Sequence, residues 1–211
     1  MVRHRTLVVN VVGLSGRLLR TAPELSRLAA AGKSVPLRTV TPAVTCSVQA
    51  TMLTGAPVAE HGVVGNGWYH RETAEVRFWC QSNALIHGEQ IWHAAKRRDP
   101  DFRGANLFWW FNMYSPADIG VTPRPMYPAD GRKIPDVYTH PAALRERLNA
   151  SLGTFPLFQF WGPGASIVSS NWIAACTREV LRNDQPDLAM VYLPPLDYEA
   201  QRFGPMPPKP P

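Results

Sequence analysis

The hydroxyl side chain of Thr45 stands at a place where chemistry on an anion could begin. It follows an irregular, proline-containing stretch and precedes a helix-compatible run over residues 47–53, which ends at Gly55. Unpaired backbone N–H groups and the positive end of the helix dipole make a helix N-terminus favourable for anions. A hydroxyl there could attack a bound phosphate, sulfate or carboxylate, or it could only cap the helix. From the local sequence alone, the cap is the more frequent role.

Three further polar side chains allow two interpretations each. Asp197 follows an apolar, strand-like run and could bind a metal, although a turn or helix cap is more frequent for such a residue. Asn66 precedes a glycine and could donate to an oxyanion, although an Asn-Gly turn is the commoner role. His61 has no second histidine at ligand spacing, which favours a structural imidazole over a metal ligand.

The composition excludes several classes of protein. With 211 residues and 45% hydrophobic content, the chain can form the core of one domain. The apolar run at residues 7–14 is too short to span a bilayer, and no signal-type cleavage site follows the first residues, so we expect a cytoplasmic protein without membrane contact. Its formal charge of +6 comes from dispersed arginines, which suits a small anionic substrate rather than nucleic acid. The three cysteines lack CxxC spacing and are interpreted as buried thiols: Cys46, Cys80 and Cys176.

Strand-like and helix-like runs alternate along the chain. This alternation predicts an α/β fold in which a mainly parallel sheet is sandwiched by helices. The predicted strands cover residues 6–14, 35–40, 76–79, 105–111 and 187–193, and the predicted helices cover residues 23–31, 47–53, 89–96, 142–152 and 171–181.

The segment from residue 112 to residue 140 breaks the alternation. It is rich in proline, glycine and tyrosine, so we expect an ordered insertion or cap over the strand ends of a single domain, residues 1–211. Ligands of such sheets bind at the carboxyl ends of the strands. Because Thr45, Asn10 and Asp197 lie at or near predicted strand ends, one site could collect all three.

Residues spread in order from Thr6 to Pro205 match the motifs of one known family. The chain resembles the type I phosphodiesterase/nucleotide pyrophosphatase family of the alkaline phosphatase superfamily, and an alkaline-phosphatase-like fold follows from that resemblance. The matching residues are Pro42, Thr45, Thr54-Gly55, Pro57, His61-Gly62, Asn66, Tyr69, Gly88-Glu89, Ile91-Trp92, Phe108-Trp109, Asp197, Phe203 and Gly204-Pro205.

The resemblance implies a metal-dependent hydrolase of phosphate esters, of the phosphodiester or nucleotide-pyrophosphate type. Thr45 would be the nucleophile that is transiently phosphorylated, Asn66 would hold a non-bridging phosphoryl oxygen, and Asp197 would be a metal ligand. Two divalent metals, usually zinc in this family, would complete the site. One metal lowers the pKa of the threonine hydroxyl, and the other stabilises the leaving oxygen. The implied substrate is a small anionic phosphate ester.

Two positions depart from the family pattern. The family's first-strand aspartate is expected close to Gly13, where this chain offers Asn10, whose carbonyl oxygen could coordinate a metal weakly. Gln201 stands four residues after Asp197, where histidine is usual, and glutamine either prefers harder metals or only hydrogen-bonds.

The later metal ligands of the family have no counterpart in this sequence. No histidine lies beyond His140 and no aspartate follows Asp197. We therefore expect the chain to be the N-terminal part of such a domain and not to turn over substrate. The alternatives are a non-catalytic binding or scaffold domain, or an inactive truncated fragment. We also expect an uncovered sheet edge that favours self-association.

Overall fold

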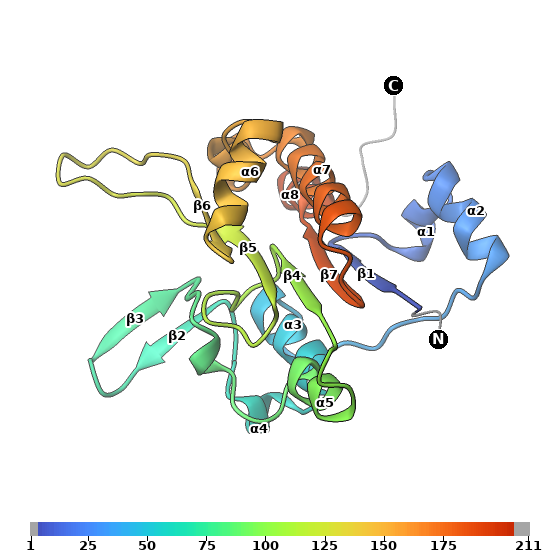
Figure 1. The fold of residues 1–211 in the computed structure, drawn as a ribbon, viewed down its shortest axis with the longest axis horizontal. Coiled ribbons are helices and arrows are strands. Elements are labelled where there is room, and N and C mark those ends of the chain that lie inside the picture. Colours follow the sequence, from blue (N-terminus) through green and yellow to red (C-terminus); the bar gives the residue numbers. More distant parts are fainter. Residues whose placement is uncertain (1–3, 205–211) are drawn as a thin grey trace.

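The computed structural model describes residues 4–204, so Pro205, the last residue of the family motif, lies outside the described part. Its centre is a five-stranded sheet with the strand order β1-β7-β4-β5-β6 (Figure 1). The first four strands run parallel, and β6 is antiparallel to β5. The strands are β1 (Thr6–Val11), β4 (Gly104–Leu107), β5 (Ile119–Pro123), β6 (Val137–His140) and β7 (Leu188–Leu193).

Helices cover both faces of this sheet, which confirms the predicted α/β class (Figure 1). One side carries α3 (Thr45–Thr54), α4 (Val58–His61) and α5 (Ile91–Arg98). The opposite side carries α6 (Ala143–Leu152), α7 (Ile167–Asn183) and α8 (Pro195–Phe203). Within residues 4–204, no helix has the length and apolar character needed to cross a membrane. The remaining elements are α1 (Gly16–Leu19), α2 (Pro23–Ala31), the antiparallel pair β2 (Gly67–His70) and β3 (Glu75–Phe78), and single turns at Asn83–Leu85, Leu157–Gln159 and Gly162–Gly164.

Strand β7 separates two hydrophobic cores. Ala189 and Val191 belong to the core under α6 and α7, whereas Leu188 and Met190 belong to the core under α3 and α5. Because both faces of β7 are buried, its sequence is a nearly continuous apolar run rather than an alternating one. The predicted strand at residues 187–193 is confirmed, and β7 places its carboxyl end in the middle of the molecule.

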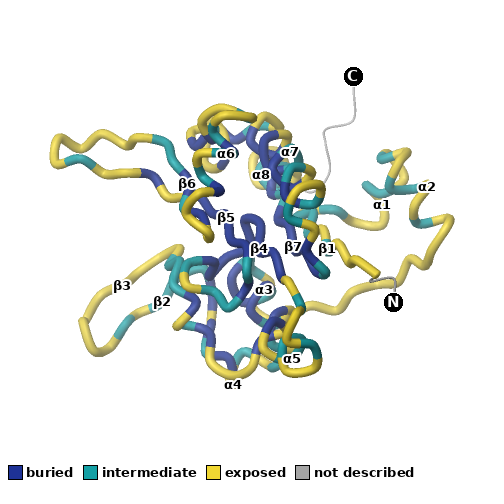
Figure 2. The backbone as a smooth tube through the Cα atoms, in the orientation of Figure 1, coloured by how far each residue is buried: buried dark blue, intermediate teal, exposed yellow. Residues whose placement is uncertain are grey.

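The first predicted strand forms but is not buried. As β1, it pairs only with β7 and is an edge of the sheet, so Leu7 and Val9 are 44% and 45% exposed (Figure 2). An apolar run indicates a strand but not its number of neighbours.

The predicted strand at residues 35–40 is absent. This segment is irregular and lies in an exposed arm that also contains α1 and α2 (Figure 2). Val35 and Leu37 are 77% and 75% exposed, and Pro36 between them has no N–H to donate to a ladder. Without a neighbouring strand, β-branched residues alone do not form one.

The segment at residues 112–140 is not a cap over the strand ends. It contributes β5 and β6 to the main sheet, and only residues 124–136 project from the body as a two-armed loop (Figure 1). Strand β5 has the sequence IGVTP, in which glycine and proline hide the strand pattern. In helix α5, Ile91 is 39% exposed, whereas Trp92 is fully buried.

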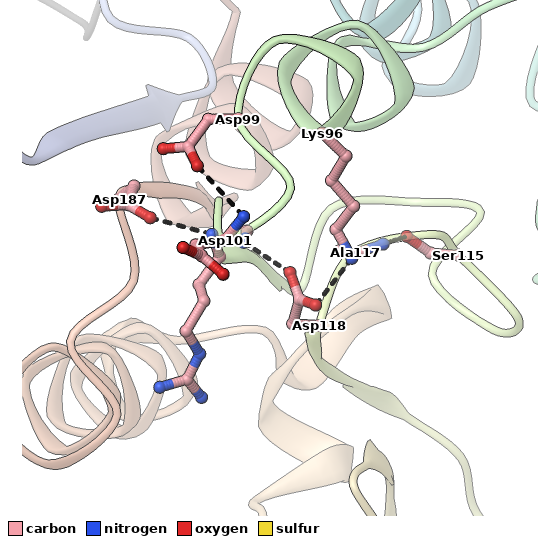
Figure 3. Close-up of polar contacts among 9 residues, drawn as sticks. Lys96, Asp99, Asp101, Ser115, Ala117, Asp118 and Asp187 are labelled. Carbon is pink, nitrogen blue, oxygen red and sulfur yellow. Dashed lines mark hydrogen bonds and ion pairs between the residues drawn. The ribbon is translucent and has the colours of Figure 1, made fainter.

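Aspartates near the amino ends of the strands have structural partners. The carboxylate of Asp118 accepts hydrogen bonds from the Gly104 N–H at 2.8 Å and the Lys96 ammonium at 2.6 Å (Figure 3). The carboxylate of Asp187 accepts from the Arg103 N–H at 2.8 Å. These contacts join β4, β5 and β7 at the edge of the sheet opposite their carboxyl ends.

Candidate active site

A cavity of about 400 Å³ lies where the carboxyl end of β7, the first turn of α3 and helix α8 meet. This is the end of a parallel sheet where ligands bind in α/β proteins. Four of the five predicted site residues line it, together with a largely aromatic wall. The lining residues are Thr45, Asn66, Trp79, Trp110, Phe160, Trp161, Gly162, Tyr192, Asp197, Tyr198 and Gln201.

Thr45 is the first residue of α3. The residue before it, Val44, is extended and offers no side-chain cap, so Thr45 belongs to the first helical turn rather than to the cap position. The next residue, Cys46, is buried, and this burial raises the pKa of its thiol to about 12. A thiol so protected from ionisation is a poor nucleophile. The Ser47 hydroxyl of the same turn is buried and donates to the Pro42 carbonyl, so Thr45 carries the hydroxyl of this turn that lines the cavity.

Asn66 caps helix α3 from a distant part of the chain. Its Oδ1 accepts a hydrogen bond from the Cys46 N–H at 2.9 Å, which satisfies one of the unpaired donors of the first turn. With the oxygen fixed in this way, the NH₂ group of Asn66 has no protein partner within residues 4–204. The arrangement presents an amide donor beside Thr45, as stabilisation of an oxyanion requires.

Helix α3 is tied to the core behind the cavity by buried polar contacts. The Oε1 of Gln49 accepts from the Trp110 N–H at 2.8 Å, and the Gln49 carbonyl accepts from the Trp109 indole at 3.3 Å. On the next turn, Thr51 Oγ1 lies 2.9 Å from Nε2 of His61. These contacts hold the helix that carries Thr45.

His61 is a structural residue, as its sequence context favoured. It is fully buried, and its Nδ1 accepts a hydrogen bond from the Val63 N–H at 3.1 Å. Burial lowers the pKa of His61 because it disfavours the charged imidazolium. Both ring nitrogens are thus occupied within the protein, so His61 has no free lone pair for a metal.

Asp197 and Gln201 lie one turn apart on α8, on the opposite wall of the cavity. The Nε2 of Gln201 donates to Oδ2 of Asp197 at 2.6 Å. A Cβ atom at Gly13, just after β1, would come within 3.2 Å of the Asp197 N, so the end of β1 packs against this turn. Helix α8 itself has no buried residue.

Asn10 is the predicted site residue that the structure does not bring to the cavity. It pairs in register with Tyr192 across β1 and β7, and it is half-buried. The cavity lining does not include it. Asn10 lies at the same level as Tyr192 but on the edge strand β1, and the wall of the cavity is formed by the neighbouring central strand β7.

The sequence did not identify Tyr192 as a site residue. Its side chain is 6% exposed and lines the cavity at the end of β7, as Thr45 does at the start of α3. Burial raises the pKa of the Tyr192 phenol, and it raises the pKa of Tyr198 on α8 to about 12. In the sequence, Tyr192 belongs to the apolar run LAMVYL and was therefore interpreted as a core residue of the strand. Its hydroxyl at the carboxyl end of a central strand could have indicated a site residue.

The donors on the cavity wall do not fit a catalytic zinc site. Asp197 is the one carboxylate among the lining residues, and the amide nitrogen of Gln201 is turned toward it. Across the described residues, no three His, Cys, Asp or Glu side chains come close enough to share a metal. A catalytic zinc normally has three protein ligands.

Comparisons with known proteins agree with the geometry. A family model described as "Type I phosphodiesterase / nucleotide pyrophosphatase" matches residues 6–210. A search of curated proteins found no match.

Two crystal structures of phosphonoacetate hydrolase from Sinorhizobium meliloti 1021 are similar in fold. The complex with phosphonoformate has a TM-score of 0.59 at 18% identity and covers 92% of this chain and 47% of that chain. The complex with phosphonoacetate has a TM-score of 0.61 at 17% identity and covers 93% of this chain and 47% of that chain. The chain thus spans about half the length of these proteins, which belong to the alkaline phosphatase superfamily. The predicted alkaline-phosphatase-like fold is confirmed.

Proposed function

The chain belongs to the type I phosphodiesterase/nucleotide pyrophosphatase family, and from this we propose that it carries the nucleophile and the phosphoryl-binding groups of a phosphate-ester hydrolase. The observation that carries the proposal is the meeting of Thr45, Asn66 and Asp197 in one cavity at the carboxyl end of the sheet. The cavity is of a size that suits a small phosphate or phosphonate anion.

In this proposal the Oγ1 of Thr45 attacks phosphorus. A bond from Oγ1 to phosphorus forms while the bond to the leaving oxygen breaks, and that oxygen keeps the electron pair. The hydroxyl proton passes to water, and the leaving oxygen takes a proton from water. The Asn66 amide donates to a non-bridging oxygen, whose charge the N-terminus of α3 also favours. Water then hydrolyses the phosphothreonine and restores Thr45.

The family is generally metal-dependent, and its members' pattern implies zinc held in part by Asp197 and the Thr45 oxygen. In this chain, Asn10 lies outside the cavity and Gln201 donates to Asp197. Because these donors do not fit a zinc centre, we derive no step through a metal. The same observation favours the second candidate function, a non-catalytic domain that binds a phosphoryl group. The cytoplasmic location, the independence from nucleic acid and the self-association stay predictions.

Orthovanadate tests the proposal, because it mimics the five-coordinate arrangement of phosphorus under attack by a hydroxyl. We expect metal-free protein to bind one vanadate per chain in calorimetric titration. Thr45→Ala should weaken this binding about tenfold or more, since the oxygen that completes the complex is lost. Thr54→Ala, at the far end of the same helix, is the matched control and should bind as the wild type. Equal binding by Thr45→Ala would show that Thr45 does not face the phosphoryl group.

A further inference from the structure

Three tryptophans in mutual contact line the cavity and form a wall of indole rings. The ring centroids of Trp79 and Trp110 lie 5.0 Å apart, and those of Trp110 and Trp161 lie 6.4 Å apart at an interplanar angle of 15°. Trp110 is 3% exposed, whereas Trp79 and Trp161 are 43% and 37% exposed. None of the three belongs to the family motifs quoted above, and the proposed reaction does not use them.

The charge of the cavity is opposite to that of the chain. The chain has a formal charge of +6, but the described residues that line the cavity include no lysine, arginine or histidine. The lining carries one carboxylate, that of Asp197, and its Oδ2 accepts from the neutral amide of Gln201 at 2.6 Å. No cation on the lining balances this negative charge. Indole faces together with an unbalanced carboxylate favour a positively charged group.

We propose that the tryptophan wall binds a quaternary ammonium group, so that the substrate is a phosphate ester of a quaternary ammonium alcohol. This inference rests on the proposed function, which places the phosphoryl group at Thr45 and Asn66, and it adds the chemical class of the leaving alcohol. The cation lies against the indole faces, and Asp197 supplies the opposite charge.

The chemistry of the wall favours a quaternary ammonium over a primary one. The face of an indole ring is negative and attracts a cation that lies within about 6 Å of its centre. A primary ammonium has three N–H donors, and those that are buried against indole faces lack acceptors, which costs free energy. A quaternary ammonium has no N–H group, and its methyl groups pack on the apolar rings without that cost.

The spacing of the rings does not form a slot for a planar ligand. Two aromatic planes that enclose a ring between them must lie about 7 Å apart, the sum of two contact distances. Trp110 and Trp161 are nearly parallel, but with their centroids 6.4 Å apart they lie too close for this. A planar ring could stack on one face only, and an uncharged ring would gain nothing from Asp197.

A backbone contact joins the wall to the proposed phosphoryl donor. The Trp79 N–H donates to the Asn66 carbonyl at 2.8 Å, so this tryptophan lies next to the residue that holds the phosphoryl group in the proposed function. Trp79 has a φ of 55°, a left-handed conformation that is rare for a bulky residue. The cavity of about 400 Å³ has room for both charged ends of one small ester.

The first test compares three phosphate esters by calorimetric titration of metal-free protein. Phosphocholine carries the quaternary ammonium, 3,3-dimethylbutyl phosphate has carbon in place of its nitrogen, and adenosine monophosphate carries a planar ring. We expect phosphocholine to bind about 5- to 30-fold more tightly than either of the others, because only its cation gains from the indole faces and the carboxylate. Equal or tighter binding of 3,3-dimethylbutyl phosphate would reduce the wall to an apolar surface, and equal or tighter binding of adenosine monophosphate would make it a stacking surface. Either result would overturn the inference.

Trp161→Leu tests the wall itself, since leucine keeps an apolar side chain and removes the indole face. Phosphocholine affinity should fall about three- to tenfold, while the affinity for 3,3-dimethylbutyl phosphate should stay within about twofold of the wild type. Phe158→Leu, at an aromatic residue that is 62% exposed in the same segment but outside the lining, is the matched control and should change neither affinity. Equal losses for the two esters, or no loss of phosphocholine binding, would overturn the inference.

Tetramethylammonium separates the cation site from the phosphoryl site. Asp197→Asn should weaken its binding about threefold or more, because the opposite charge is lost, and should not weaken vanadate binding. Unchanged tetramethylammonium binding in Asp197→Asn would overturn the inference, as would vanadate binding by a wild type that does not bind tetramethylammonium. In the last case the proposed function would stand. A wild type that binds tetramethylammonium through Trp161 and Asp197 but does not bind vanadate would support the cation site and overturn the proposed attack by Thr45.

Discussion

The two walls of the cavity are built differently. Helix α3 carries Thr45 and buries five of its ten residues, and it is tied to Asn66 by a partly buried hydrogen bond and to Trp110 by a buried one. Helix α8 carries Asp197 and Gln201 and buries none of its nine residues. Its attachments are the packing of Gly13 against its first turn and hydrogen bonds from Arg202 to the carbonyls of residues 162–165.

The two walls would therefore contribute differently to the proposed reaction. On the α3 wall, the proposed nucleophile Thr45 lies on a helix held by buried contacts, and the Asn66 amide is held by its bond to the Cys46 N–H, as preorganised catalysis requires. On the α8 wall, one carboxylate is engaged by an amide from the same helix, and no second carboxylate or imidazole lines the cavity. Under the proposed function, the described residues would supply the phosphoryl-binding part of the site, and their donors do not fit its metal-binding part.

Because α3 is buried and α8 is not, a Leu→Ala substitution should lower the free energy of unfolding much more on α3 than on α8. Leu53→Ala, at a residue of α3 that is 1% exposed, should lower the free energy of unfolding by about 2–5 kcal/mol. Leu196→Ala, at a residue of α8 that is 37% exposed, should cost about 1 kcal/mol or less. Denaturant unfolding of the two variants measures both values. Similar costs would mean that α8 is as firmly packed as α3.

Asn66→Asp separates the two roles of Asn66. The carboxylate still accepts from the Cys46 N–H at a helix N-terminus, so the stability should stay close to that of the wild type. Vanadate affinity should fall about tenfold or more, because a donor is replaced by a negative charge. Asn66→Ala is the control that loses the cap as well, at about 1 kcal/mol. If Asn66→Asp binds vanadate normally, the amide does not face the anion.

Asp197→Asn tests the charge of the opposite wall. In metal-free protein, the Asp197 carboxylate repels a bound anion with no lysine, arginine or histidine on the cavity lining to offset it. Removing the charge should therefore raise vanadate affinity about two- to fivefold. Glu199→Gln on the same helix, outside the lining, is the matched control. A fall in affinity would show that Asp197 supports anion binding, as a metal ligand does.

The smallest expected effect concerns pH and the support of α3. Folding lowers the pKa of His61 below its ordinary value of 6.5, so the unfolded chain takes up the proton first as the pH falls. The contribution of neutral His61 to the free energy of unfolding should be fully present above about pH 6.5 and should decline as the solution is acidified through that value. His61→Gln should flatten this dependence between about pH 7.5 and about pH 5.5 in thermal unfolding. An unchanged slope would show that another group titrates.

Much of the fold could be predicted, because the central strand β7 and helices such as α7 have local patterns that match their burial. The edge position of β1 and the missing strand at residues 35–40 could not be predicted in this way. Both features depend on whether a neighbouring strand exists, and the sequence of a single segment does not indicate its neighbours. Strand β5 was missed because glycine and proline interrupt its apolar residues.

In the candidate site, too, some residues could be predicted from the sequence and others could not. Thr45, Asn66 and Asp197 were identified through motif residues, and they meet in the cavity. Asn10 was expected there, but it lies on the edge strand β1 and is not part of the cavity lining. Tyr192 was missed because it shares the cavity lining with Thr45, from a distant part of the chain, and only the packing of α3 on the sheet brings the two parts together.

The central proposal is that residues 4–204 supply the phosphoryl-binding part of a hydrolase site but not its metal-binding part, so that the 211-residue chain holds no catalytic zinc. Its most direct test is to purify this chain in saturating zinc, remove free metal, and measure both bound zinc and hydrolysis of bis(4-nitrophenyl) phosphate. The account predicts well below one zinc per chain and the same background hydrolysis for the wild type and Thr45→Ala. About one zinc or more per chain, with turnover that Thr45→Ala abolishes, would contradict it.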